Sequence, residues 1–262
     1  MAGVVGSRFW PMSTSKTPKK YLDVLNVGKS LIRQTFERFN KITPTENILV
    51  VTNEDYRELV KEHLPELKDN QILGEPIGRN TAPCIAYATE KILKRNPNAS
   101  MVVAPSDHII RNEDVFTEVV TNSLAYVSDK NVLGTLGIKP SRPDTGYGYI
   151  HFSRHGNDDG FCNVKSFTEK PMLAKAEEFL ASKQYLWNAG IFVWSARSIK
   201  ESFKQNLPYL DKKFEELKEN LDTDKEAIAI AKVYTTCENI LVDYGILDTE
   251  RNVEVFIARF TC

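Results

Sequence analysis

Short aliphatic runs alternate with segments of helical spacing through the first half of the chain. The apolar runs are typical of buried strands and lie at residues 47–52, 71–75, 100–104 and 131–138. The stretches with helical periodicity cover residues 30–39, 54–63, 81–95 and 113–127. This β-α-β-α rhythm predicts an α/β fold with a mostly parallel sheet and helices on both faces. Ligands bind such sheets beyond the carboxyl ends of the strands, so polar residues just after a strand are the first candidates for chemistry.

The pattern changes character after about residue 140. Paired strands are predicted at 147–152 and 160–169, and a further strand at 191–194. Helical spacing covers residues 173–182, 196–206, 209–220 and 225–234, and a last strand is predicted at 253–257. The sequence has no internal repeat, low-complexity tract or flexible linker. We therefore expect one α/β domain over 1–262, with a first half of about 1–140 and a mixed-strand second half of about 141–262.

Composition narrows the classes of partner. Of the 262 residues, 42% are hydrophobic and 26% charged, and the formal net charge is −1, so a general nucleic-acid binder is not expected. No apolar run approaches the roughly 20 residues that cross a bilayer, and no membrane partner is expected. The four cysteines are widely spread and form no C-x-x-C pair, which indicates reduced thiols in a cytoplasmic protein.

A glycine-containing loop near the start of the chain has the features of an anion site. Gly3 and Gly6 let the backbone run close to a bulky ligand, and Ser7 follows them. Arg8 and Lys19 add positive charge, so a nucleoside triphosphate is a natural ligand. An ordinary glycine turn with basic residues on the surface is the alternative.

A second loop invites comparison with the phosphate-binding P-loop. Gly28, Lys29 and Ser30 match the end of that motif, but Asp23 stands where its first glycine is needed. Without that glycine the backbone cannot wrap the phosphates, so the sequence predicts only the start of a helix at Ser30.

The loop after the predicted strand 71–75 is a second candidate for contact with a nucleotide. Its candidate residues are Glu75, Pro76, Gly78, Arg79, Asn80 and Thr81. Arg79 and Asn80 can offer hydrogen-bond donors and an acceptor to a base or a ribose. Capping of the next helix by Asn80 or Thr81 is the alternative explanation.

Asp107 follows the predicted strand 100–104 almost directly. A carboxylate at this place can hold Mg²⁺ against the oxygens of a triphosphate, because hard cations prefer carboxylate and phosphate oxygen. A turn aspartate that only caps a helix is the alternative.

Short motifs in the second half suit a phosphorylated sugar. Their candidate residues are Tyr147, Gly148, Glu169, Lys170, Asn188, Gly190 and Asp243. Glu169 can accept hydrogen bonds from sugar hydroxyls, and Lys170 can meet a phosphate as a point charge. If each motif is considered alone, a surface ion pair explains Glu169 and Lys170, and ordinary turns explain the others.

Taken in order, these motifs resemble those of the sugar-nucleotide pyrophosphorylases, and residues 8–13 (RFWPMS) look most like mannose-1-phosphate guanylyltransferases. The resemblance implies a Rossmann-like three-layer nucleotidyltransferase fold with a sugar-binding extension. It also implies transfer from GTP to mannose 1-phosphate, giving GDP-mannose and pyrophosphate, with Mg²⁺ held by Asp107. Arg8 and Lys19 would then contact the triphosphate and Lys170 the sugar phosphate. The chain can form a homo-oligomer, whose size the sequence does not give.

The sequence departs from that family at three places. Val4 stands where a second glycine is usual, and the strand that enters the glycine loop and an aspartate beyond strand 253–257 lie outside the chain. We therefore expect a fragment of a catalytic domain with low or no activity. The alternatives are an inactive relative that binds only nucleotide or a partner subunit, and a pyrophosphorylase for another base or sugar, such as a thymidylyltransferase acting on glucose 1-phosphate.

Overall fold

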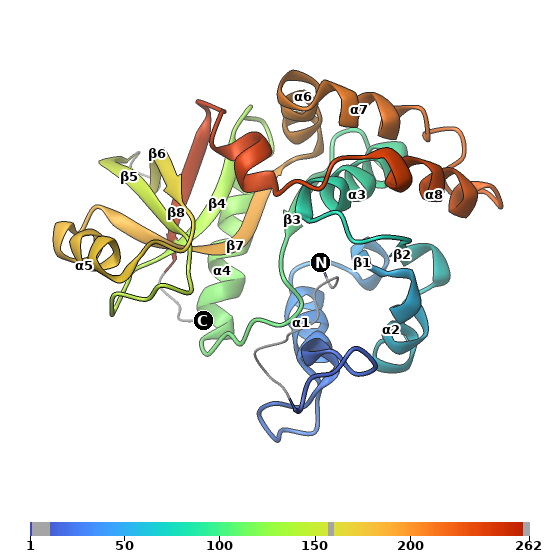
Figure 1. Ribbon diagram of the computed structural model, residues 1–262, viewed down its shortest axis with the longest axis horizontal. Helices are drawn as coiled ribbons and strands as arrows, with labels where there is room; N and C mark the ends of the chain where they lie inside the picture. The colour runs from blue at the N-terminus through green and yellow to red at the C-terminus, as the bar shows by residue number, and fades with distance from the viewer. Residues whose placement is uncertain (2–10, 157–159, 259–262) are drawn as a thin grey trace. The chain divides into compact units, whose positions relative to one another are not determined.

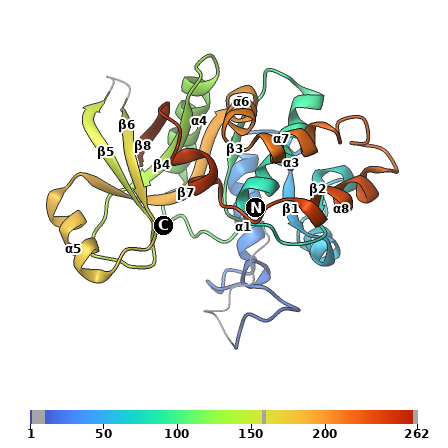
Figure 2. The same cartoon turned by 45° about the horizontal axis from the view of Figure 1, so that its top comes forward.

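The computed structural model describes residues 1, 11–156 and 160–258, and of residues 154–156 it describes the backbone alone (Figures 1 and 2). The chain forms two compact units, each built from separated segments. The first unit comprises Met1–Lys94, Pro105–Ile109 and Tyr209–Ile240. The second comprises Arg95–Ala104, Ile110–Pro208 and Leu241–Cys262.

The first unit has a two-stranded parallel sheet surrounded by helices. The strands are β1 (Val50–Asn53) and β2 (Ile72–Glu75), in which Val50 pairs with Ile72. The α-helices of this unit are α1 (Leu31–Asn40), α2 (Arg57–His63), α3 (Thr81–Arg95), α7 (Pro208–Glu215) and α8 (Glu226–Thr236). One terminal residue of α3 and one of α7 belong to the second unit. Its 3₁₀ turns are η2 (Lys19–Tyr21), η3 (Thr45–Asn47), η4 (Glu54–Tyr56) and η5 (Asp69–Gln71). Apolar side chains of both strands, α1 and α2 form one core with Tyr21.

The helix predicted at Ser30 begins as the sequence requires. Ser30 is the N-cap of α1, and its hydroxyl accepts a hydrogen bond from the Arg33 backbone N–H at 3.4 Å. In the loop before it, the carboxylate of Asp23 accepts hydrogen bonds from the N–H groups of Val27 and Gly28. The Lys29-Ser30 pair is therefore a helix start, as predicted.

The second unit is built on a six-stranded sheet with the order β3-β7-β4-β8-β6-β5. Its strands are β3 (Ser100–Val103), β4 (Leu133–Ile138), β5 (Tyr149–Gly156), β6 (Phe161–Thr168), β7 (Tyr185–Ser195) and β8 (Val253–Ala258). Its helices are α4 (Glu113–Val127), α5 (Leu173–Ser182), α6 (Ala196–Asn206) and the π-helical turn η6 (Asp243–Leu247). Helix α4 packs against β3, β4, β7 and β8 and lies across one face of the sheet (Figures 1 and 2).

The α/β fold is confirmed, but a mostly parallel sheet is not. Within the described residues β4 and β8 pair in parallel, whereas β7 pairs antiparallel with β3, β4 and β5. The sequence predicted only residues 191–194 of β7, which runs from Tyr185 to Ser195. Alternating strands and helices predict a parallel sheet only if strands that follow one another in the sequence also pair in the sheet. Here β7, which comes much later in the sequence than β3 and β4, lies between them. The division into a nucleotide half of about 1–140 and a sugar-phosphate half of about 141–262 stays a prediction.

The bounds of several helices follow their hydrophobic spacing closely. Helices α3, α4, α5 and α6 begin and end where the sequence predicts them. In the described part of the chain, no helix is long and apolar enough to cross a membrane.

Candidate functional site

A small pocket in the second unit contains most of the residues that the sequence assigned to a sugar. Its lining residues are Gly148, Tyr149, Phe167, Thr168, Glu169, Asn188, Asp243 and Tyr244. Its empty volume of ≈ 210 Å³ includes open solvent, so these residues line a small open hollow and not an enclosed cavity.

Sheet pairing explains why segments far apart in sequence meet at this pocket. Gly148 directly precedes β5 and Glu169 directly follows β6, while Asn188 lies within β7. Strand β5 pairs antiparallel with both β6 and β7, which places Tyr149 opposite Thr168 and also opposite Trp187. The backbone N–H of Asn188 donates to the Gly148 carbonyl at 2.8 Å, which joins the residue before β5 to β7 beside the pocket.

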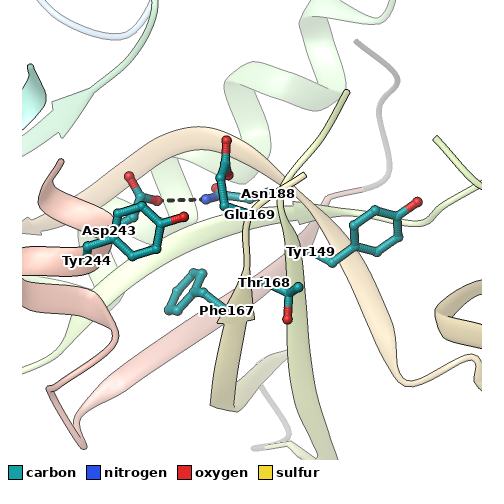
Figure 3. A pocket seen from close by; sticks show the side chains of 8 residues that line it. Tyr149, Phe167, Thr168, Glu169, Asn188, Asp243 and Tyr244 are labelled. Carbon is teal, nitrogen blue, oxygen red and sulfur yellow. Dashed lines mark hydrogen bonds between the residues drawn. The ribbon is translucent and has the colours of Figure 1, made fainter. Parts of the chain in front are cut away.

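The amide of Asn188 is fixed on two sides. Its Nδ2 donates to Asp243 Oδ1 at 2.9 Å, and Figure 3 shows these two side chains pointing toward one another. Its Oδ1 accepts from the Gly190 backbone N–H at 2.9 Å, and Gly190 has a φ of +63° that glycine adopts without strain. Gly190 thus acts on the pocket by orienting Asn188.

Asp243 places a mostly buried carboxylate at the pocket. Burial, with a smaller contribution from the nearby Glu169, raises its pKa, while the hydrogen bond from Asn188 opposes that shift. Two acidic side chains beside one cavity offer several acceptor atoms, and neighbouring hydroxyl groups of a sugar supply matching donors.

Glu169 lies so close to Gly148 that any larger residue at 148 would displace the glutamate carboxylate. A Cβ on residue 148 would lie 2.6 Å from Glu169 Oε2 and 3.5 Å from the Asn188 Cβ. The glycine that the sequence assigned to this site therefore makes room for the glutamate side chain.

Lys170 pairs with the acid beside it. Its Nζ lies 2.6 Å from Glu169 Oε1, at the rim of the site. Its backbone has a φ of +41°, which is uncommon for a residue with a side chain. Strained backbone of this kind is found often at ligand sites, where the surrounding structure maintains it.

Tyr147 is the one predicted sugar residue with a prominent contact elsewhere. Its ring stacks on Trp187 with centroids 4.9 Å apart, and it is not among the residues that line the pocket. The guanidinium carbon of Arg142 lies 5.3 Å from the Trp187 ring centroid. In this structure Tyr147 therefore supports the neighbouring strand β7.

Within the first unit the structure brings Lys19 and Asp107 together. Lys19 Nζ lies 3.4 Å from Asp107 Oδ2 and 3.5 Å from the Asp107 carbonyl oxygen. The hydroxyl of Thr35 on α1 donates to the Ser106 carbonyl at 3.3 Å, which holds the segment that carries Asp107. The predicted Gly3, Gly6, Ser7 and Arg8 lie outside the described residues.

The donor set around Asp107 limits how a metal ion can bind. Within the residues that the structure describes, no group of three or more His, Cys, Asp or Glu side chains is placed to hold a metal ion. Mg²⁺ is commonly held by one or two carboxylates, with waters and substrate phosphates completing its shell. Asp107 fits an ion of that kind, in which the ligand supplies most of the oxygens.

Glu75 is buried at the end of β2. It accepts a hydrogen bond from the Tyr234 hydroxyl of α8 at 3.1 Å. Burial is the largest influence and raises the pKa of Glu75 to about 7, while Tyr234 and Lys20 act in the opposite direction. Burial also lowers the pKa of Lys20 to about 8. Glu75, which the sequence suggested for a nucleotide, is here largely enclosed by protein, as is Lys20.

Arg79 and Asn80 contact the end of α8 and the residues after it. Arg79 Nε donates to the Tyr234 carbonyl at 3.1 Å, and Asn80 Nδ2 donates to Asn239 Oδ1 at 2.7 Å. Asn80 has a φ of +62°, and Thr81 begins α3, while Pro76 and Gly78 are exposed in the loop. The side chains of Arg79 and Asn80 thus anchor this loop to α8, a role that the sequence did not suggest.

Four residues that line the pocket had no predicted role. They are Tyr149, Phe167, Thr168 and Tyr244. Three of them are adjacent to a residue that the sequence did single out, and Phe167 is two positions before Glu169; the aromatic residue that follows the acid at 243 was the available signal.

Comparison with known proteins places the chain in a family. The sequence model of the family described as "Nucleotidyl transferase" matches residues 1–233. The chain belongs to this family. The family expected from the sequence motifs is thus confirmed.

Curated relatives within the nucleotidyl transferase family match almost the whole chain. It is 34% identical over 251 residues to a putative mannose-1-phosphate guanylyltransferase of Vibrio cholerae serotype O1, covering 95% of this chain and 53% of the relative. It is 35% identical over 263 residues to a mannose-1-phosphate guanylyltransferase of Salmonella montevideo, covering 97% of this chain and 55% of the relative. The chain spans about half the length of the curated relatives it matches.

Solved structures of similar fold support the same placement. A protein of Thermus thermophilus, described as a mannose-1-phosphate geranyltransferase, matches with a TM-score of 0.89 and 29% identity over 100% of this chain and 73% of that one. A protein described as mannose-6-phosphate isomerase from Helicobacter pylori has a TM-score of 0.77 and 26% identity, covering 94% of this chain and 96% of that one.

Proposed function

We propose that the chain is a catalytic part of a mannose-1-phosphate guanylyltransferase, which transfers a guanylyl group from GTP to mannose 1-phosphate. One observation carries the proposal: four separated segments bring Gly148, Glu169, Asn188 and Asp243 to one pocket, with Lys170 paired to Glu169 beside it. The names of the similar Vibrio and Salmonella proteins support GTP and mannose 1-phosphate as the substrate pair.

The reaction needs positioning and charge neutralisation rather than a strong base. An oxygen of the sugar phosphate forms a bond to the α-phosphorus of GTP, and the bond from that phosphorus to the departing pyrophosphate breaks. A phosphate dianion is already a competent nucleophile, so no side chain has to remove a proton. Lys170 neutralises the incoming phosphate, and Glu169, Asn188 and Asp243 hold the sugar.

Residues of the first unit are assigned to the triphosphate. Lys19 contacts its phosphates, and Arg8, outside the described residues, is assigned to the pyrophosphate group. Asp107 would hold Mg²⁺, which supplies further positive charge at the phosphates when bound. The loop of residues 75–81 is assigned to the nucleoside, with its backbone as the contact, because Glu75, Arg79 and Asn80 are bonded to other parts of the unit.

Paired binding and transfer measurements test this function. Calorimetry with GTP and with mannose 1-phosphate, both with Mg²⁺, should detect each ligand. Product analysis should find GDP-mannose and pyrophosphate, at a low rate if the chain is a fragment. Faster pyrophosphate release with another pair, such as dTTP and glucose 1-phosphate, would overturn the substrate assignment. Binding of GTP alone, without mannose 1-phosphate or product, would indicate an inactive nucleotide binder.

A further inference from the structure

Tyr244 is an exposed aromatic side chain at a pocket that both polar and aromatic residues line. Its relative exposure is 51%, although it lines the pocket with Glu169, Asn188 and Asp243. Figure 3 shows its ring beside Asp243, with the hydroxyl directed toward the side of the pocket where Asn188 and Glu169 lie. A large apolar ring in this position is available to a ligand.

The other tyrosine at the pocket is committed to the protein. Tyr149 is fully buried; its hydroxyl donates to the Asp144 carbonyl at 2.9 Å and accepts from the Asp144 N–H at 3.0 Å. Its ring packs on Phe179 with centroids 5.3 Å apart, and Figure 3 shows it pointing away from Asp243 and Asn188. Among the described residues, the hydroxyl of Tyr244 has no hydrogen-bond partner of this kind.

The backbone at Tyr244 is arranged to present two neighbouring side chains to one cavity. Tyr244 lies in η6, where the Asp248 N–H donates to the Asp243 carbonyl at 2.9 Å in the wide π-helical pattern. Ile246 and Leu247 are buried on the other side of this turn and anchor it. Single π-helical turns are frequent at functional sites. The turn lets both Asp243 and Tyr244 line the pocket.

Sugar chemistry matches this combination of groups. A pyranose ring has hydroxyl groups around its edge and carbon-bound hydrogens on its faces, so a site binds it well with acceptors at the edge and an aromatic ring against one face. Glu169 and Asp243 supply the acceptors. The Tyr244 hydroxyl is protonated at neutral pH and can donate to a sugar oxygen.

We propose that Tyr244 is the aromatic wall of the hexose subsite and packs against the face of the hexose 1-phosphate whose hydroxyls Glu169 and Asp243 bind. This inference rests on the proposed function, because that function supplies the sugar phosphate. It adds a residue that recognises the shape of the hexose ring, separate from those that bind its hydroxyls and its phosphate.

Equilibrium binding to three variants tests the role. In calorimetry, Tyr244→Ala should weaken the binding of mannose 1-phosphate about tenfold, and Tyr244→Phe, which keeps the ring, should weaken it no more than about threefold. Binding of GTP should stay within twofold in both. Tyr209→Ala is the matched control, since Tyr209 is 61% exposed on α7 and belongs to the first unit.

The outcomes separate this inference from the proposed function. Unchanged mannose 1-phosphate affinity in Tyr244→Ala, or an equal loss in Tyr244→Phe, would overturn the aromatic role. If no transfer from GTP is detected, the proposed function fails. Weaker binding of mannose or glucose 1-phosphate by Tyr244→Ala would in that case still show that Tyr244 packs against the sugar. If the unaltered chain binds neither sugar phosphate, the inference is overturned.

Discussion

The polar side chains compared here have different roles in the two units. In the first unit, Glu75 accepts from Tyr234, Arg79 donates to the end of α8, and Lys91 lies between Asp222 and Glu226. In the second unit, Glu169 and Asp243 line a cavity that a ligand can enter. The same residue types thus hold elements together in one unit and face a cavity in the other.

This difference predicts which property each substitution changes. Replacing a polar residue that is enclosed by protein leaves its partners buried and lowers the free energy of unfolding. Replacing one at the pocket rim removes an interaction with substrate and leaves the folded protein nearly as stable. Stability and activity, measured on the same variants, should therefore separate the enclosed residues of the first unit from the pocket residues of the second.

The largest effect is expected on the transfer rate of a Lys170→Met variant. Loss of one positioned charge typically lowers a rate by on the order of 10² to 10³, or about 3–4 kcal/mol, and pyrophosphate release measures it. The melting temperature should hardly change, because Lys170 is exposed and pairs with the neighbouring Glu169 near the surface. Lys175→Met is the control; this lysine pairs with Glu178 on α5 and should retain the full rate. Equal rates in the two variants would remove Lys170 from the site.

Lys91→Met should have the largest effect on stability in the first unit. The Lys91 side chain is 1% exposed, and its Nζ lies 2.7 Å from Asp222 Oδ1 and 2.8 Å from Glu226 Oε2. Removing the cation of a buried ion pair typically costs about 3 kcal/mol, which urea unfolding at neutral pH can measure. Lys61→Met removes a lysine with two exposed acidic partners and should change stability little. A Lys91 variant as stable as the Lys61 variant would contradict the structural role of this cluster.

Glu75 should make the stability of the first unit depend on pH. Its pKa is raised from 4.5 to about 7 by burial, so the folded state holds a proton that the unfolded state releases. Its contribution to the free energy of unfolding should therefore fall as pH rises from about 4.5 to 7, and stay low above that range. Glu75→Gln, which keeps an acceptor for Tyr234, should gain about 2–3 kcal/mol relative to the unaltered chain as pH rises from about 5 to 8. If the free energies of unfolding of the two proteins changed with pH in parallel, Glu75 would not have the raised pKa that its burial predicts.

Local patterns allowed the helices and the candidate residues to be predicted, but not the partners of those residues. Helical spacing placed α3 and α5 well, because local periodicity and end signals determine a helix. Hydrogen-bonding capacity marked Arg79 as a residue that needs acceptors, but that capacity does not distinguish a nucleoside from the Tyr234 carbonyl, 155 residues away. The pairing of Asn188 with Asp243 depends on β7 running antiparallel, which no local pattern indicated.

The smallest predicted effect compares two glycines that each lie against a glutamate. A Cβ at Gly148 would lie 2.6 Å from Glu169 Oε2, and one at Gly74 in β2 would lie 1.6 Å from Glu54 Oε2. Both carboxylates end flexible side chains, so an alanine should displace the glutamate at modest cost in stability. In Gly74→Ala the displaced Glu54 is exposed, and mannose 1-phosphate affinity should not change. In Gly148→Ala the displaced Glu169 is the proposed sugar acceptor, and affinity should fall about tenfold, as expected for one lost hydrogen bond to a charged group. Calorimetry on both variants decides whether Glu169 binds the sugar, because equal affinities would place its carboxylate outside the hexose contact.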